Sequence, residues 1–404
     1  MNILFLTLVS TKNINERGIY NDLMRKFSSE GHKVYIISPF ERRLKQQTEQ
    51  TIQSGIHLLK IKTLNIQKTN VIEKGIATLL LEYQFLRALK KYYNNIKFDL
   101  ILYSTPPITY AKVIKYIKKR DSAKSYLLLK DIFPQNAVDI GLMKKNGFLY
   151  KYFRNKEKEL YKVSDFIGCM SPENVKYILK HNPEIDTQKV EVNPNSIEPV
   201  ENNISFEEIN RKRAELGIPE KAVFFLYGGN LGLPQGIDFL VEVLNSQKDN
   251  SEVFFLIVGS GTMYPKIKKW IDVNKPENVK LIEALPKNEY DEIVKCCDVG
   301  MIFLDKRFTI PNFPSRLLSY LETKKPVNLA TDKNTDMGKI AEENNFGFWT
   351  ESGDLNTFNN NLTKIIKERA LREKMGQNGF DYFINNYTTS HSYKIIMKHF
   401  ENVH

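Results

Sequence analysis

Short apolar runs alternate along the chain with segments in which apolar residues recur every three or four positions. Ile3–Val9 is typical of a buried parallel strand, and the spacing in residues 19–27 predicts a helix that ends at Gly31. Val34–Ile37 is the next predicted strand. A strand–helix–strand unit of this kind requires parallel pairing and a right-handed crossover.

The same alternation continues along the rest of the chain, in two series separated by a polar, acidic linker, Glu198–Glu208. Further strands are predicted at Leu58–Ile61, Asp99–Tyr103, Tyr126–Leu129, Phe166–Met170, Val190–Val192, Val223–Tyr227, Val253–Val258, Val279–Ile282, Val299–Leu304 and Val327–Ala330. Helices are predicted at Leu79–Tyr92, Leu149–Val163, Ile237–Leu244, Tyr290–Cys297 and Pro314–Thr323, after the N-cap residue Ser171, and from about Ser390.

A chain of 404 residues rarely forms a single core, so the two series predict two α/β domains, residues 1–196 and 197–387. Each is expected to be a doubly wound, Rossmann-like domain. Open parallel sheets bind ligands beyond the carboxyl ends of their strands. We therefore expect the functional residues directly after strands, facing a cleft between the domains.

Composition and net charge restrict the kinds of partner that the protein is expected to bind. The net charge of +12 favours a polyanion, which can be nucleic acid, an anionic lipid surface or a phosphorylated small molecule. Cys169, Cys296 and Cys297 form no Cys-x-x-Cys motif, which fits buried thiols in a reducing compartment. Neither a signal peptide nor an apolar stretch of ~20 residues is found. We expect a cytoplasmic protein that meets a membrane only at its surface.

Glycines cluster after the first strand of the second series, between Tyr227 and Gly236. Exposed amides of such a loop can bind phosphate, although the segment is neither a Walker A loop nor a Gly-x-Gly-x-x-Gly fingerprint. Gly259 and Gly261 follow the next strand, where a tight turn is the favoured explanation. Arg316 lies in the first turn of a predicted helix, where the helix dipole disfavours a cation. This placement favours an anionic ligand beside Arg316.

Two candidates come from the first series. Lys130 and Asp131 directly follow a predicted buried strand, where a carboxylate could orient a hydroxyl or act as a base. A helix cap or a local ion pair explains Asp131 equally well. Gly18 closes the polar loop after the first strand, where glycine would let the backbone approach a substrate, although a simple turn into the helix is the favoured explanation.

The sequence lacks the residue patterns that several classes of chemistry require. The six histidines have no metal-ligand spacing, and neither an Asp-x-Asp triplet nor a Gly-x-Ser-x-Gly elbow occurs. Two basic segments, residues 86–93 with 112–120 and residues 142–154, interleave cations with apolar residues. That composition suits an interfacial helix on anionic lipid and also suits nucleic acid. The second segment favours the membrane.

The order of these motifs resembles the GT-B glycosyltransferases of family 4, over essentially the whole chain. The branch that builds bacterial capsule and O-antigen units, which includes N-acetyl-fucosamine transferases, is the most similar. The motifs are the Gly18 loop, Gly31–Val34, Leu129–Pro134, Val192–Asn195, Tyr227–Gly236, Val258–Gly261, and Phe313–Arg316 with Tyr320 and Lys325–Val327.

The resemblance implies a UDP-sugar donor held by the second domain and an acceptor on the first, beside Arg17 and Gly18. It also implies transfer with retention and without a metal or other cofactor, onto a membrane-bound, polyprenyl-diphosphate-linked acceptor. The transferred sugar would be an N-acetylated amino or deoxy sugar. The final helix, 388–404, would cross back onto the first domain. The protein would lie on the inner face of the cell membrane, with no nucleic acid as partner.

Donor residues follow from the resemblance with some departures. Many relatives have an arginine and a lysine where this chain has Asn230 and Gln235, and two glutamates where it has Pro311 and Ser319. The Pro-Ser-Arg motif at 314–316 then makes Arg316, next to Ser315, the expected diphosphate ligand. The expected donor residues are Gly229, Asn230, Gly232, Gln235, Gly259, Gly261, Leu285, Pro286, Ser315, Arg316, Ser319 and Glu322.

Within that set, Leu285 and Pro286 would lie against the uracil, and Glu322, one helical turn after Ser319, could replace the missing ribose ligand. Relatives often have a histidine near the reacting atoms where this chain has Lys130 and Asp131, which makes Asp131 the candidate catalytic residue with Lys130 beside it. Three alternatives stay open: a nucleotide-sugar epimerase, a basic nucleic-acid-binding protein, and an inactive relative acting as a scaffold.

Overall fold

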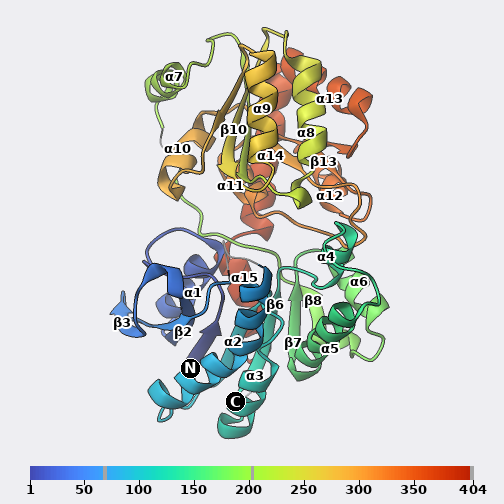
Figure 1. Cartoon of the computed structure of the whole chain (residues 1–404). Coiled ribbons are helices and arrows are strands. Elements are labelled where there is room, and N and C mark those ends of the chain that lie inside the picture. Colours follow the sequence, from blue (N-terminus) through green and yellow to red (C-terminus); the bar gives the residue numbers. More distant parts are fainter. Residues whose placement is uncertain (67–70, 202–203, 401–404) are drawn as a thin grey trace. The chain divides into compact units, whose positions relative to one another are not determined.

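A computed structural model describes residues 1–66, 71–201 and 204–400. The chain forms two compact units, Met1–Glu198 with the C-terminal segment from Thr389, and Pro199–Thr388 (Figure 1). Each unit is a parallel sheet with helices packed on it. The predicted fold class, two Rossmann-like α/β domains, is confirmed. Residues 202–203 of the predicted linker and 401–404 of the predicted last helix lie outside the described residues.

The first unit contains an eight-stranded sheet in the order β3-β4-β2-β1-β5-β6-β7-β8, parallel except that β3 pairs antiparallel with β4. Its strands are β1 (Asn2–Leu6), β2 (Lys33–Glu41), β3 (Glu49–Gln53), β4 (Ile56–Thr63), β5 (Leu100–Ser104), β6 (Lys124–Leu129), β7 (Phe166–Cys169) and β8 (Val190–Val192). Its helices are α1 (Ile19–Ser29), α2 (Val71–Tyr92), α3 (Ala111–Asp121), α4 (Gln135–Asp139), α5 (Phe148–Val163), α6 (Pro172–His181) and α15 (Thr389–Met397), with 3-10 turns at Arg42–Leu44 and Thr187–Lys189.

The last helix, α15, packs on α1 in the first unit. Ile396 is fully buried in the core that α1 shares with the sheet. The Tyr393 hydroxyl lies 3.0 Å from His32 Nε2, and the Ser392 hydroxyl donates to Asn193 Oδ1 at 2.7 Å. The chain therefore returns to its first unit after completing the second.

The second unit contains a six-stranded parallel sheet in the order β11-β10-β9-β12-β13-β14. Its strands are β9 (Val223–Asn230), β10 (Val253–Ser260), β11 (Val279–Ile282), β12 (Val299–Phe303), β13 (Val327–Thr331) and β14 (Gly347–Glu351). Its helices are α7 (Phe206–Glu215), α8 (Ile237–Gln247), α9 (Tyr264–Asn274), α10 (Lys287–Cys296), α11 (Arg316–Glu322), α12 (Met337–Glu343), α13 (Leu355–Lys367) and α14 (Arg369–Asn386), with a 3-10 turn at Leu233–Gln235.

Several predicted bounds are wrong for local reasons. The first strand ends at Leu6, because Thr7 accepts a hydrogen bond from Val9 and starts a turn. Helix α7 begins inside the predicted linker, because Ser205 and Glu208 form a capping box. The predicted N-cap at Ser171 is confirmed, and all three cysteines are buried and unpaired. None of the helices in the described part of the chain is long and apolar enough to cross a bilayer.

Candidate functional site

The glycine-rich loop of the second unit extends its central strand. β9 stays paired with β10 as far as Asn230, so the strand continues through Gly228 and Gly229 instead of ending at Tyr227. Gly229 has a φ of 123°, a region that side chains rarely adopt. A Cβ on Gly228 would lie 1.9 Å from the Tyr290 hydroxyl. The loop needs Gly228 for packing, and Gly229 and Asn230 are exposed.

Gly259 and Gly261 bring the next strand-end loop against this one. A Cβ on Gly259 would lie 2.0 Å from the Gly229 carbonyl oxygen, and one on Gly261 would lie 2.4 Å from the Leu231 carbonyl oxygen. The Leu231 N–H donates to the Ser260 carbonyl at 2.9 Å. Both glycines therefore have a packing role, which is to let the two loops meet.

Arg316 lies beside this loop as the first residue of α11. Its guanidinium carbon is 4.7 Å from the centroid of the Tyr227 ring, and its Nη2 donates to Gln235 Oε1. A Cβ on Gly229 would lie 3.6 Å from the same guanidinium carbon. Nη1 is buried and has no hydrogen-bond partner among the described residues. Since an unpaired buried donor costs free energy, this nitrogen makes Arg316 a candidate ligand for an anion.

Asn230 and Gly232 complete the loop. The Tyr227 hydroxyl donates to the Asn230 carbonyl at 2.9 Å. Asn230 is exposed, and its side-chain nitrogen lies 3.0 Å from the position that a Cβ on Gly232 would occupy. The fold thus brings seven of the predicted donor residues together: Gly229, Asn230, Gly232, Gln235, Gly259, Gly261 and Arg316.

The other predicted residues of α11 differ in surroundings. Ser315 is exposed just before the helix, and Ser319 is half-buried. Glu322 is buried, and its Oε1 accepts a hydrogen bond from the Val200 N–H at 3.0 Å. This contact gives Glu322 a structural role at the start of the second unit, and its contact with a ribose stays a prediction.

Leu285 and Pro286 lie in the loop between β11 and α10. Leu285 is half-buried, and Pro286 is exposed as the residue that precedes the first turn of α10. The Tyr290 N–H of that turn donates to the Pro286 carbonyl at 3.0 Å. The loop therefore offers an apolar edge and backbone groups in the same unit as Arg316.

In the first unit, Lys130 and Asp131 follow β6 and are held by the loop after β5. Thr105 Oγ1 accepts from the backbone N–H groups of Lys130 and Asp131, at 2.9 and 3.1 Å. Asn136 Nδ2 donates to both carboxylate oxygens of Asp131, at 2.7 and 2.9 Å. Lys130 Nζ donates to the Asn193 carbonyl at 3.1 Å. The carboxylate is therefore oriented by an amide and not by a salt bridge.

Burial changes the acidity of this pair. It raises the pKa of Asp131 to about 6, although hydrogen bonds from Asn136 and the Ile132 N–H partly offset the shift. It also lowers the pKa of Lys130 to about 7. Burial, with a smaller effect of the Asp131 charge, raises the pKa of Tyr20 to about 12. Both members of the pair thus change charge near neutral pH, as groups that handle protons often do.

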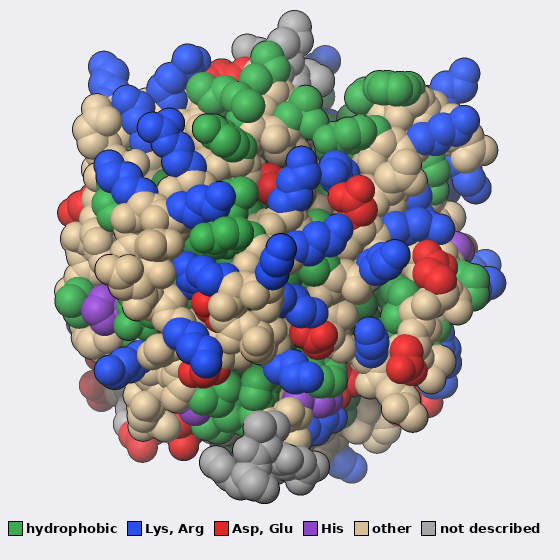
Figure 2. Space-filling model, turned by 90° about the horizontal axis from the view of Figure 1, so that it is seen from below, with side chains coloured by type: hydrophobic (Ala, Val, Ile, Leu, Met, Phe, Trp, Pro, Cys, Tyr) green, Lys and Arg blue, Asp and Glu red, His purple; other side chains and the backbone are tan. Residues whose placement is uncertain are grey.

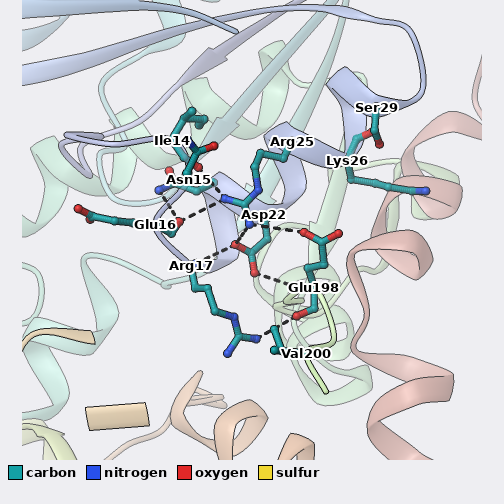
Figure 3. Close-up of polar contacts among 12 residues, drawn as sticks. Ile14, Asn15, Glu16, Arg17, Asp22, Arg25, Lys26, Ser29, Glu198 and Val200 are labelled. Carbon is teal, nitrogen blue, oxygen red and sulfur yellow. Dashed lines mark hydrogen bonds and ion pairs between the residues drawn. The ribbon is translucent and has the colours of Figure 1, made fainter. Parts of the chain in front are cut away.

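The loop that contains Arg17 and Gly18 is organised by Asp22, a residue that the sequence did not single out (Figure 3). Asp22 Oδ1 accepts from the Gly18 N–H at 2.9 Å and from Arg25 Nη2 at 2.8 Å, and its Oδ2 accepts from the Glu198 N–H at 3.0 Å. Arg17 donates to the Glu198 carbonyl at 2.9 Å. A Cβ on Gly18 would meet nothing within 4 Å, so packing does not require glycine there.

The first unit contains a cavity of about 500 Å³, and its lining includes Ile132, the residue after Asp131. It lies between the loop that follows β6 and helices α5 and α6. Its lining combines aromatic and basic side chains, with Ile132, Pro134, Tyr150, Lys151, Arg154 and Tyr177 among them. Such a lining can accept a ligand that is partly apolar and partly anionic.

Sequence analysis missed the residues that position the candidates: Asp22, Thr105, Asn136, Tyr227 as a stacking partner, and Tyr290. Thr105 follows a predicted strand, so its location gave a signal, whereas its double acceptor role depends on the fold. Of the described residues, no group of three or more His, Cys, Asp and Glu side chains is arranged to hold a metal ion.

Solved structures identify the class of fold. Sucrose-phosphate synthase from Thermosynechococcus elongatus superposes with a TM-score of 0.76 at 12% identity, over 100% of this chain and 99% of that one. HepE from Anabaena, crystallised in complex with UDP, superposes with a TM-score of 0.70 at 14% identity, over 99% of each chain. The chain has the GT-B fold.

Sequence relatives identify the class of enzyme. Residues 208–382 match the family model described as Glycosyl transferases group 1. The probable glycosyltransferase WbjE of Pseudomonas aeruginosa is 23% identical over 288 residues, 70% of this chain and 69% of that protein. The putative colanic acid biosynthesis glycosyl transferase WcaI of Escherichia coli is 21% identical over 254 residues, 60% of each. The chain is an enzyme, a glycosyltransferase of the hexosyl-transferring type.

Proposed function

We propose that this glycosyltransferase moves a sugar, with retention at the anomeric carbon, from a UDP-sugar to a polyprenyl-diphosphate-linked acceptor on the inner face of the bacterial cell membrane. The observation that carries the proposal is the half-buried guanidinium of Arg316 beside the exposed Gly229, with its buried Nη1 lacking a partner among the described residues. A planar guanidinium next to an exposed glycine suits a diphosphate.

In the donor site, Arg316 and the backbone of the glycine-rich loop at Gly229 and Gly232 would bind the diphosphate, and Ser315 would add a hydroxyl. Ser319, with Glu322 behind it, would face the ribose, and Leu285 and Pro286 would face the uracil. Gly259 and Gly261 shape the neighbouring loop. HepE, which shares the fold, was crystallised with UDP, and this supports a uridine nucleotide as the donor.

In the reaction, charge develops on the departing diphosphate as its bond to the sugar breaks. Arg316 and the loop amides would stabilise that charge, which is work that a divalent metal does in other enzymes, so no metal is required. The acceptor hydroxyl would attack from the same face and give its proton to the leaving phosphate oxygen. Asp131 would orient the acceptor or the sugar, with Lys130 beside it.

The acceptor side belongs to the first unit. The cavity beside Asp131 and the Gly18 loop with Arg17 are the places where an acceptor sugar and its diphosphate would bind. The relative WcaI is named for colanic acid biosynthesis, which supports a role in a surface polysaccharide, capsule or O-antigen. An N-acetylated amino or deoxy sugar is the proposed cargo.

Thermal unfolding in EDTA with UDP, GDP, ADP or TDP tests the proposal. A ligand at ~100 times its Kd stabilises by about 2.7 kcal/mol, which raises the midpoint by ~2–4 °C per kcal/mol for a unit of this size. We expect UDP alone to give this shift, Arg316→Ala to abolish it, and Arg369→Ala, at an exposed position of the same unit, to retain it. No shift with any nucleotide, together with tight, salt-sensitive binding to nucleic acid, would refute the proposal. Consumption of UDP-sugar without an acceptor would indicate an epimerase.

A further inference from the structure

Helix α2 exposes a stripe of apolar side chains. Ile76, Leu79, Leu80 and Tyr83 are 48%, 53%, 43% and 63% exposed. Their spacing of i, i+3, i+4 and i+7 places them on one face of the helix. The opposite face is packed against the first unit, where Ala77, Leu81, Phe85 and Leu89 are at most 1% exposed.

A helix that is apolar on both faces is normally covered on both. Scattered apolar residues on a surface need no explanation, but four neighbours in a row form a patch of the kind that marks an interaction site. The described residues leave this stripe uncovered.

Positive charge surrounds the stripe. The same helix face continues into Arg87 and Lys90, both exposed. Helix α3 packs beside α2 and presents an exposed row of Lys112, Lys115 and Lys119. Lys90 Nζ lies 4.8 Å from the ring centroid of Tyr116 on α3, which joins the two sets of cations.

A second apolar group lies beyond α3, which packs against α5 as well as α2. Phe148 and Leu149, at the start of α5, are 84% and 59% exposed, and Lys151 follows them on the surface. Figure 2 shows Lys and Arg side chains spread over one side of the molecule, with exposed hydrophobic groups among them and along its upper edge. Apolar ridges bordered by cations match an anionic lipid surface.

We propose that α2 and α3 form a membrane-docking surface, in which Ile76, Leu79, Leu80 and Tyr83 insert among anionic lipids while the lysines of α3 bind the headgroups. This inference rests on the proposed function insofar as a lipid-linked acceptor requires the enzyme at a bilayer. A second copy of the chain is the competing occupant. It is disfavoured because a symmetric interface on this stripe would bring the lysine row of one copy near that of the other.

Co-sedimentation of the full chain with vesicles tests the surface, with phosphatidylglycerol in phosphatidylcholine against phosphatidylcholine alone. We expect binding only to the anionic vesicles. Leu79→Gln with Leu80→Gln, which keeps helix propensity, should weaken binding at least ~10-fold. Val273→Gln, at a residue 72% exposed on α9, is the matched control and should bind like the wild type. Each Lys→Gln change at 112, 115 or 119 should cost about fivefold.

A second measurement keeps the test decisive if the double variant unfolds. In Tyr83→Trp, the added emission, measured against the wild type with Trp270 and Trp349, should shift to the blue on anionic vesicles. Bound protein whose added emission does not move would overturn the proposal. So would a wild type that ignores vesicles but sediments as a dimer, with the Leu79→Gln/Leu80→Gln variant monomeric.

The vesicles carry neither acceptor nor nucleotide, so the outcome is separate from that of the transferase test. Stripe-dependent vesicle binding without UDP stabilisation would leave the docking surface standing and remove the donor assignment. UDP stabilisation together with vesicle binding that is unchanged in the Leu79→Gln/Leu80→Gln variant would support the donor assignment and remove the docking surface.

Discussion

The guanidinium of Arg316 stacks on the ring of Tyr227, 4.7 Å from its centroid, and also donates to Gln235. Stacking on an aromatic face is favourable for a guanidinium and fixes the plane of its donors. These two contacts hold a cation at the amino end of α11, where the helix dipole is unfavourable. An anion bound beside Arg316 would offset this unfavourable interaction with the helix dipole.

We therefore expect Arg316→Ala to lower kcat/KM by ~10²–10³, the usual cost of removing one donor that stabilises developing charge. Arg316→Lys should recover little of it, because lysine has neither the planar face that stacks on Tyr227 nor the rigid fork of donors that reaches Gln235 and a ligand together. Steady-state rates on a lipid-linked acceptor measure the effect. Equal losses in Arg316→Ala and in the surface control Arg369→Ala would contradict this role.

We expect Asp131 to cause a fall in kcat/KM at acidic pH, which is the acid limb of the pH–rate profile. Burial raises the pKa of its carboxyl to about 6. If the ionised form orients the substrate, kcat/KM falls as pH drops below about 6, and Asp131→Asn is both slower and flat over that range. A pH–rate profile from 5 to 8 measures this. An acid limb that persists unchanged in Asp131→Asn would assign it to another group.

The same shift has a consequence for stability. Because the folded state holds the Asp131 proton more tightly than the unfolded chain does, the stability it contributes is complete below the unfolded pKa, near 4, and is lost as pH rises through about 6. Asp131→Asn should thus gain stability relative to the wild type between pH 4 and pH 7. Denaturation midpoints at several pH values would show it.

Much of the fold follows from the period of the apolar residues. Buried strands such as Val253–Val258 are continuous apolar runs, and helices such as residues 19–27 repeat every three to four positions, so both were predicted from the chain alone. The edge strand β3 was missed because Glu49–Gln53 is polar and largely exposed, which removes the periodic signal. Helix α14 was missed as well, because its apolar residues do not gather on one face.

The candidate site was predictable as positions and not as contacts. Lys130, Asp131 and Gly229 were found because each follows a strand predicted in its own unit, and ligands bind beyond the carboxyl ends of parallel strands. The partners that orient them come from elsewhere in the chain: Thr105 is 26 residues from Asp131. Asp22 was missed because a carboxylate within a helix is usually solvated, and only the fold shows it fully buried.

Asp22 should be among the most sensitive positions of the first unit. It accepts hydrogen bonds from Gly18, Arg25 and Glu198 with no exposure to solvent. Asp22→Ala removes the acceptor that these three donors share and should destabilise the first unit by about 3–5 kcal/mol, as breaking a buried ion pair does. The matched change Asp238→Ala breaks an exposed pair with Lys266 and should cost at most ~1 kcal/mol. Urea denaturation measures both, and similar losses would show that Asp22 is not the organiser of the Gly18 loop.

Gly228 and Tyr290 should be energetically coupled. A Cβ on Gly228 would lie 1.9 Å from the Tyr290 hydroxyl oxygen, so Gly228→Ala must displace the ring and should cost about 1–3 kcal/mol. Tyr290→Ala alone leaves a cavity and should cost ~3 kcal/mol or more. Since the added methyl would occupy part of that cavity, the double variant should lose at least ~0.5 kcal/mol less than the sum of the single losses.

Gly18→Ala is the control, because a Cβ there meets nothing within 4 Å and its loss of stability should stay within ~0.5 kcal/mol. Additive losses at 228 and 290 would show that the strand moves instead of the ring, and that Gly228 is required by the backbone and not by its neighbour.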